Sequence, residues 1–218
     1  MPRLLFEKTG NAVWISHLDL MRLFQRAFKR AGLPLTHTQG FNPRPSVSIA
    51  MPLSVGVESC CELLDFDLYG EKLPNAEILT RLNEALVAGV RVLQVYDDGA
   101  KIKHLSYLAC EVTLEYDRPI PSDACDRIRS LFAGEEVLAE KKGKNGITEQ
   151  NIVPMIRALS VTAGAGEIRL CATVCCQNPS LNPMQLSAAV IRHLPELTPD
   201  HVLCKRLEIY DTQNNVFR

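Results

Sequence analysis

The chain has 218 residues and a formal net charge of -1, with 46% hydrophobic and 22% charged residues. This balance is typical of a globular protein of one or two domains and excludes an intrinsically disordered chain. The longest apolar runs fall far short of the roughly 20 residues that a membrane-spanning helix needs, so we expect no contact with a membrane.

The first hundred residues predict the element order β-α-β-β-α-β. Their N-terminus, MPRLLFEKTG, lacks the apolar core of a signal peptide, which predicts a cytoplasmic protein. The expected elements are a strand at 3–8, an extended segment at 12–15, a helix at 16–31, a loop at 32–45, strands at 46–53 and 61–69, a helix at 75–86 and a strand at 90–97.

The same order returns after a polar stretch at 97–106. The expected elements are a strand at 108–116, a helix at 122–133 with Ser122 as N-cap, a strand at 135–142, a hairpin of 156–164 and 166–176, a helix at 182–194 and a strand at 202–211. Pro154 interrupts the apolar segment before Arg157, so a helix there is doubtful.

Two β-α-β-β-α-β units in tandem predict an α+β fold of two ferredoxin-like domains, each an antiparallel sheet with helices on one face. We expect an N-terminal domain at 1–100, a C-terminal domain at 104–211 and a tail at 212–218.

The eight cysteines do not form a metal-binding motif. Cys171 and Cys175 could begin a cluster motif, but the third position of such a motif holds Asn178. Cysteines in a strand-like run also point to alternate faces. We therefore expect small buried cysteines, no metal and no cofactor.

The helix at 16–31 has a clear start and a clear buried face. Ser16 followed by Asp19 three residues later resembles a capping box, and Gly32 with Pro34 ends the helix. The apolar positions recur at helical spacing: Leu20, Leu23, Phe24, Ala27, Phe28 and Ala31.

Basic residues occupy the other faces of this helix. We call Arg22, Arg26, Lys29 and Arg30 the basic ridge; Asp19 is placed to pair with Arg22. Residues 8–45 hold six basic residues and one acidic residue, about +5, against -1 for the whole chain. A local excess of this kind attracts anions, and guanidinium groups suit phosphate or carboxylate. The alternative is a solvated helix face with no ligand.

The loop after the helix, THTQGFNPRPS, gathers hydrogen-bonding side chains around Gly40 and one aromatic ring. Gly40 permits a positive φ, and the two prolines hold the exit extended. Such a loop is suited to stacking on a base and reading its edge, although Phe41 could instead fill the core. The candidate binding residues for an anion or RNA are Lys8, Arg22, Arg26, Arg30, His37, Gln39, Phe41, Asn42 and Arg44.

His17, in the first helical turn, is the one candidate for acid–base catalysis. With Lys8 and Arg22 on a phosphate, it could cleave RNA without a metal. The alternative is a histidine that bonds to backbone and has no chemical role.

The motifs I-S-H-L-D-L-M-R at 15–22, A-G-L-P at 31–34 and T-Q-G-F-N-P-R-P at 38–45, with Phe6, Lys8 and Gly10 before them, resemble a bacterial domain of unknown function linked to radical-SAM proteins. The resemblance is dense over the first seventy residues. It implies a stand-alone partner of a radical S-adenosylmethionine protein, with any radical chemistry belonging to that partner.

Three functions are compatible with these observations. The first is an accessory protein to a radical-SAM enzyme that binds RNA or a ribosomal substrate through the basic patch. The second is a protein-docking or small-anion-binding module without nucleic acid. The third is a metal-independent RNA endonuclease that uses His17.

Overall fold

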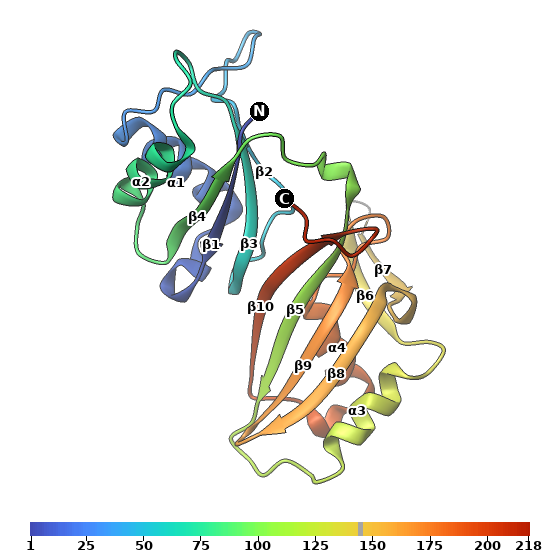
Figure 1. Ribbon diagram of the computed structural model, residues 1–218. Helices are drawn as coiled ribbons and strands as arrows, with labels where there is room; N and C mark the ends of the chain where they lie inside the picture. Colours follow the sequence, from blue (N-terminus) through green and yellow to red (C-terminus); the bar gives the residue numbers. More distant parts are fainter. Residues whose placement is uncertain (144–145) are drawn as a thin grey trace. The chain divides into compact units, whose positions relative to one another are not determined.

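The structure, a computed structural model, describes residues 1–143 and 146–218 (Figure 1). The fold is mixed α+β with mostly antiparallel sheets. The chain divides into two compact units, Met1–Ile102 together with Arg218, and Lys103–Phe217. No helix in the described ranges is long and apolar enough to cross a membrane.

Unit 1 is an antiparallel sheet in the order β4-β1-β3-β2, with both of its α-helices on one face (Figure 1). Its elements are β1 (Arg3–Lys8), the 3-10 helix η1 (Gly10–Trp14), α1 (His17–Arg30), β2 (Val47–Ile49), β3 (Val57–Phe66), α2 (Asn75–Ala85) and β4 (Val90–Tyr96).

Aromatic pairs fix α1 on this sheet. Phe6 of β1 meets Phe24 of α1 edge-on with ring centroids 4.8 Å apart, and Phe28 of α1 lies 5.1 Å from Phe66 of β3. All four rings are fully buried, and such pairs add to the stabilisation from apolar burial. The buried face of α1 therefore determines which of its residues reach solvent.

Unit 2 has a second antiparallel sheet, in the order β10-β5-β9-β8, and a separate hairpin of β6 and β7. Its elements are β5 (Leu105–Glu115), α3 (Ala124–Phe132), β6 (Leu138–Gly143), β7 (Gly146–Asn151), η3 (Val153–Met155), β8 (Ile156–Gly164), β9 (Glu167–Cys175), α4 (Met184–His193), η4 (Pro195–Leu197) and β10 (His201–Asp211); η2 (Ile102–His104) lies at the boundary of the two units.

Side chains of α4 hold the hairpin by its open edge. Gln185 Nε2 donates to the carbonyl of Glu140 at 2.8 Å, and His193 Nε2 lies 3.0 Å from the carbonyl of Leu138. Both carbonyls belong to β6 and lie on the edge that β7 does not pair. Because exposed strand edges invite pairing with other chains, these two bonds protect the hairpin.

Several sequence predictions are wrong in detail. The segment 12–15 is mostly part of η1, because Gly10 takes φ +55° and turns the chain out of β1. The expected strand 46–53 ends at Ile49, because Met51 has φ +50°. The N-cap of α3 is Asp123 and not Ser122, and β7 was not anticipated.

Residues 212–218, expected to form a tail, fold back along β10. The backbone N–H of Phe217 donates to the carbonyl of Ile209 at 2.8 Å, and Phe217 is only 2% exposed. Burial of this one aromatic ring explains why the end of the chain is ordered.

Candidate functional site

The first turn of α1 is fixed by a capping box. The Asp19 N–H donates to Ser16 Oγ at 3.2 Å, and the Ser16 hydroxyl donates to the Asp19 carboxylate at 2.8 Å. Arg22 Nη1 donates to the same carboxylate at 3.0 Å. These bonds from Ser16 and Arg22 lower the pKa of Asp19. The predicted cap and the predicted Asp19–Arg22 pair are both present.

All four residues of the basic ridge are exposed, but they are not equivalent. Arg30 donates through Nη2 to the carbonyl of Ala85 at the end of α2, so it joins the two helices. Arg22 is oriented by Asp19 while its side chain stays 66% exposed. The side chains of Arg26 and Lys29 reach solvent and form no hydrogen bond or ion pair in the described ranges. The groups most available to an anion are therefore Arg22, Arg26 and Lys29.

Lys8 does not belong to this surface, which corrects its assignment as an anion-binding residue. Lys8 is 0% exposed, and its Nζ donates to the carbonyl of Val13 in η1 at 3.1 Å. Since η1 covers the end of β1, the ammonium group supports local structure and cannot reach a phosphate outside the protein.

The loop that leaves α1 is closed by hydrogen bonds between its two sides. The Thr38 N–H donates to the carbonyl of Arg44 at 2.8 Å, and the Arg44 N–H donates to Thr38 Oγ1 at 3.0 Å. The Ser46 N–H donates to the carbonyl of Thr36 at 2.8 Å. We call residues 36–46 the clamped loop.

The tip of the clamped loop presents an aromatic ring to solvent. Gly40 has φ +133°, as its position in a tight turn requires. Phe41 is 106% exposed, so the prediction that it could fill the core is wrong. Gln39, Asn42 and Arg44 are exposed beside it. The closed loop therefore leaves both faces of the Phe41 ring accessible to a planar ligand.

A cleft of about 440 Å³ lies between the C-terminal half of α1 and the base of the clamped loop. Three polar residues, Gln25, Lys29 and His37, face it. The rest of its lining is Gly32, Leu33, Pro34, Leu35 and Pro45. We call it the loop cleft; it joins the basic ridge to the loop through Lys29. Sequence reasoning missed Gln25, whose place on the exposed face of α1 was the available signal.

His17 lies in the first turn of α1 and is half-buried. Its Nδ1 is shielded from solvent and has no hydrogen-bond partner in the described part of the chain. Of the two phosphate-binding residues assigned to it, Arg22 stays exposed beside Asp19, but Lys8 is buried. The three residues are therefore not assembled as a cleavage site.

Two exposed apolar side chains near the start of α1 were not singled out from the sequence. Trp14, at the end of η1, is 71% exposed, and Leu18 is 67% exposed. Trp14 is the single tryptophan of the chain. In Figure 1, η1 and the tip of the clamped loop lie at opposite ends of α1.

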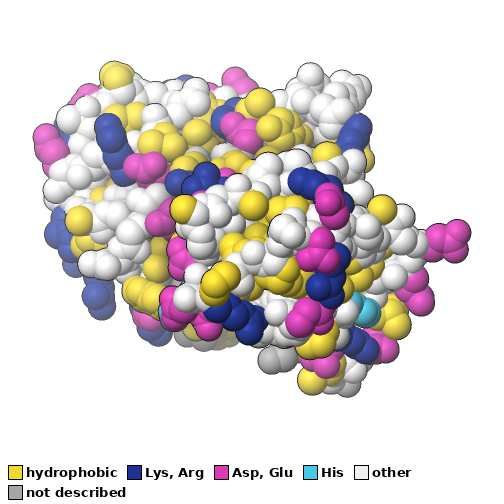
Figure 2. Space-filling view, turned by 90° about the horizontal axis from the view of Figure 1, so that it is seen from below, with side chains coloured by type: hydrophobic (Ala, Val, Ile, Leu, Met, Phe, Trp, Pro, Cys, Tyr) yellow, Lys and Arg dark blue, Asp and Glu magenta, His cyan; other side chains and the backbone are white. Residues whose placement is uncertain are grey.

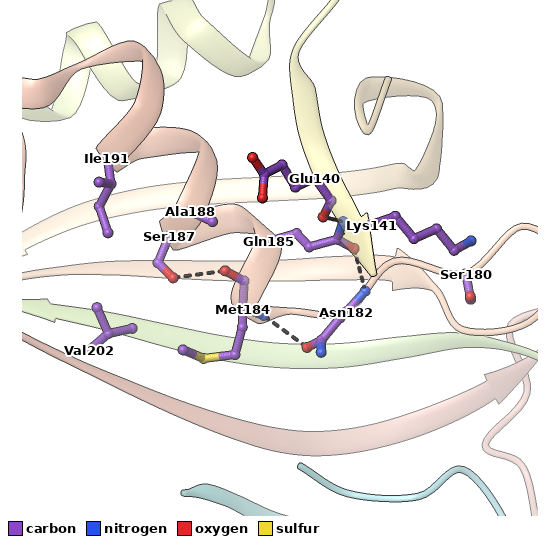
Figure 3. A pocket seen from close by; sticks show the side chains of 10 residues that line it. All are labelled: Glu140, Lys141, Ser180, Asn182, Met184, Gln185, Ser187, Ala188, Ile191 and Val202. Carbon is purple, nitrogen blue, oxygen red and sulfur yellow. Dashed lines mark hydrogen bonds between the residues drawn. The ribbon is translucent and has the colours of Figure 1, made fainter. Parts of the chain in front are cut away.

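Unit 2 has a larger cleft, of about 670 Å³, between α4, β6 and β10 (Figure 3). Its amide groups are already used: Asn182 Oδ1 accepts from the Met184 N–H at 3.1 Å, and Gln185 Oε1 accepts from the Asn182 N–H at 3.0 Å. Met184, Ala188 and Ile191 give it an apolar wall at helical spacing. With its amides bonded within unit 2, this cleft has Glu140, Lys141 and Ser180 as its remaining polar side chains, and a carboxylate among them disfavours an anion.

The expectation of buried cysteines is confirmed only in part: three of the eight are buried, four are partly buried, and Cys171 is exposed. Burial raises the pKa of Cys110 and of Cys204 to about 12, so both stay thiols at neutral pH. In the described ranges no three acidic, histidine or cysteine side chains gather as metal ligands.

Charge elsewhere on the surface is mixed. On the face that Figure 2 shows, acidic side chains lie beside most of the basic ones. Mixed signs cancel at short range, so such a face attracts no particular ion. On α1, by comparison, Asp19 is the single acid beside the four exposed residues of the basic ridge.

A family model described as "Uncharacterized protein conserved in bacteria (DUF2344)" matches residues 2–183. No curated protein matches the chain.

Two solved structures are similar to the chain. A chain of "Crystal Structure of a Cbf5-Nop10-Gar1 Complex" is 8% identical with a TM-score of 0.52, and the match covers 95% of this chain and 48% of that one. The protein thus spans about half the length of that relative, and at this identity the likeness concerns the fold alone. "Crystal Structure of an Unknown Protein from Galdieria sulphuraria" is 11% identical over 94% of this chain and 96% of that one, with a TM-score of 0.26.

Proposed function

Since the chain belongs to DUF2344, a family of uncharacterized bacterial proteins, we propose that it is an RNA-binding accessory protein to a radical-SAM enzyme. Its RNA or ribosomal substrate would bind on unit 1, along the basic ridge and the clamped loop. The protein would position that substrate, and the partner would supply the chemistry.

The observation that carries this proposal is the full exposure of the Phe41 side chain. Its ring is 106% exposed at the tip of a loop that the Thr38–Arg44 bonds close. A base can stack on either face of such a ring, which adds about 1–3 kcal/mol per base. Amides at Gln39 and Asn42 are placed beside it, where they can bond to base edges.

The basic ridge supports binding of the phosphate backbone. Arg22, Arg26 and Lys29 share the solvent face of α1, and Arg44 leaves the clamped loop. Exposed guanidinium and ammonium groups on one helix face bind phosphates with little sequence preference. The basic ridge would bind the phosphate backbone of the RNA, and the clamped loop would recognise its bases.

The sheet topology supports a finer description of the scaffold. If the β6–β7 hairpin is left out and the remaining strands are numbered within each unit, the sheets β4-β1-β3-β2 and β10-β5-β9-β8 both have the order 4-1-3-2. We propose that each unit is a ferredoxin-like domain, with the β6–β7 hairpin inserted in the second. A sheet with helices on one face is a common scaffold for RNA recognition.

The radical-SAM association rests on the sequence motifs at 15–22, 31–34 and 38–45 and on their resemblance to the radical-SAM-linked domain. It predicts that the two proteins co-purify from their own cells.

The test is recovery of RNA crosslinked to the protein in its own cells. A variant with Arg22, Arg26 and Lys29 replaced by Ala is compared with one in which exposed Arg91, Lys101 and Lys103 are replaced. Both lose three positive charges, but only the first loses the three ridge residues most available to an anion. Specific RNA enriched by the wild type and the control variant, and lost from the ridge variant, supports the proposal. Equal recovery from all three proteins contradicts it.

Exposure of Trp14 and Leu18 favours a second function, docking of the radical-SAM protein itself without RNA. A complex that survives ribonuclease and is lost on Trp14→Ala with Leu18→Ala would support this role. A complex that forms with the double variant at unchanged affinity would exclude it.

A further inference from the structure

The loop cleft has the features of a site for one planar group that carries an anion. We infer that it binds a single unpaired nucleobase, with the attached phosphate at Lys29. The inference rests on the proposed function and deepens it, because it places base selection in this cleft and stacking at Phe41.

The size and the walls of the cleft suit a nucleotide. Its volume of about 440 Å³ lies within the range of small-ligand sites, roughly 300–1,000 Å³. Pro34, Leu35 and Pro45 give it apolar surfaces, and prolines are stiff. A base can therefore lie against these walls without the protein having to order a flexible segment first.

The polar groups of the cleft are unused. The side chains of Gln25, Lys29 and His37 form no hydrogen bond or ion pair within the described part of the chain. A glutamine amide both donates and accepts, and an imidazole can do either. These are the groups that read the edge of a base, and Lys29 at the junction with the ridge can bind its phosphate.

The charge of the lining restricts the ligand. None of the eight lining residues is acidic, so the cleft offers no counter-charge to a cation. A paired base has its edge covered by its partner, so the base that enters must come from a single strand, a loop or a bulge.

The experiment measures affinity for four labelled RNA oligonucleotides, each with a different repeated base. Three variants are compared. The first combines Gln25→Leu and His37→Leu, the second is Lys29→Ala, and the control is Gln94→Leu at an exposed position of β4. The double variant should reduce the preference for the best base by about two- to tenfold, the loss expected for one or two hydrogen bonds. Lys29→Ala should weaken all four RNAs by a similar factor, and Gln94→Leu should change none.

A second measurement separates failure of the cleft from failure of RNA binding. Nucleoside 5′-monophosphates and inorganic phosphate are titrated while the ring resonances of His37, assigned with His37→Gln, are followed by NMR. A shift with a nucleotide but not with phosphate supports the cleft, whatever the result with long RNA.

Absence of that shift, or an unchanged base preference in the double variant, would contradict base binding in the loop cleft. Neither result would bear on RNA binding by the basic ridge. Failure of every RNA to bind the wild type, with the His37 shift present, would instead overturn the proposed function and leave a mononucleotide site.

Discussion

Thr38 and Arg44 bond to each other twice: the Thr38 N–H donates to the Arg44 carbonyl at 2.8 Å, and Thr38 Oγ1 accepts the Arg44 N–H at 3.0 Å. This pair closes residues 39–43 into a tip and directs Phe41 into solvent. The exposed position of the aromatic ring thus depends on the hydrogen bonds of Thr38.

Thr38→Val keeps the shape of the side chain and removes the acceptor for the Arg44 N–H. We expect RNA affinity to fall about two- to tenfold, because the tip loses one of its two closing bonds. Thr38→Ser, which keeps the hydroxyl, is the matched control in a fluorescence anisotropy titration. Equal affinity of the two variants would show that the second bond does not order the tip.

Phe41→Ala should weaken RNA binding by about 1–3 kcal/mol, the contribution of one stacked base. The free energy of unfolding should not change, because the ring is 106% exposed. Phe41→Trp should retain binding, and Tyr69→Ala, which removes another aromatic residue that is 76% exposed, is the control. A loss of stability with Phe41→Ala would contradict the exposed position of the ring.

Arg26→Ala and Arg30→Ala should separate binding from structure. The exposed Arg26 side chain forms no hydrogen bond or ion pair in the described ranges, so its loss should reduce the salt dependence of RNA binding and change stability little. Arg30 bonds the end of α2, so its loss should cost about 1–2 kcal/mol of unfolding free energy in urea. If Arg26→Ala lowered stability and Arg30→Ala reduced the salt dependence of RNA binding, the roles assigned to the two residues would be wrong.

Lys8→Ala should lower the free energy of unfolding by about 2–3 kcal/mol, because the buried ammonium group bonds the Val13 carbonyl. RNA affinity of the folded protein should stay the same. If Lys8→Ala had wild-type stability and bound RNA weakly, Lys8 would be an RNA-binding residue after all.

The buried thiols predict a dependence on alkaline pH. Burial raises the pKa of Cys110 and Cys204 from 9.0 to about 12, so folding favours the protonated form. Their contribution to stability is complete below pH 9 and is lost as the pH rises toward 12. Iodoacetamide at pH 8 should modify these two cysteines only after unfolding, as peptide mass spectrometry would show. Rapid modification of the native protein would contradict their burial.

Helix α1 was predictable because its signals are local: a cap at Ser16, an apolar stripe and a glycine at the end. The burial of Lys8 was not predictable, because it depends on η1 folding over the end of β1. Gly10 was read as part of a motif, and its positive φ, which turns the chain, could not be inferred from the segment alone.

The candidate site was also predictable only in part. Basic residues at helical spacing indicated a ridge, but only the packing of α1 on α2 shows that Arg30 is engaged. The loop composition indicated recognition, whereas the exposure of Phe41 follows from hydrogen bonds across the loop. The loop cleft needs α1 and Pro45 side by side, which no local pattern encodes.

The central claim is that unit 1 binds single-stranded RNA through the ridge, and its most direct test is a salt titration of RNA affinity. For the wild type, four phosphate contacts, made by Arg22, Arg26, Lys29 and Arg44, predict a slope of log affinity against log salt of about -3. The variant lacking Arg22, Arg26 and Lys29 should show a slope of about -0.7, from Arg44 alone, and the Arg91, Lys101 and Lys103 variant should keep that of the wild type. Equal slopes for the ridge variant and the wild type, or no binding by the wild type at low salt, would contradict the claim.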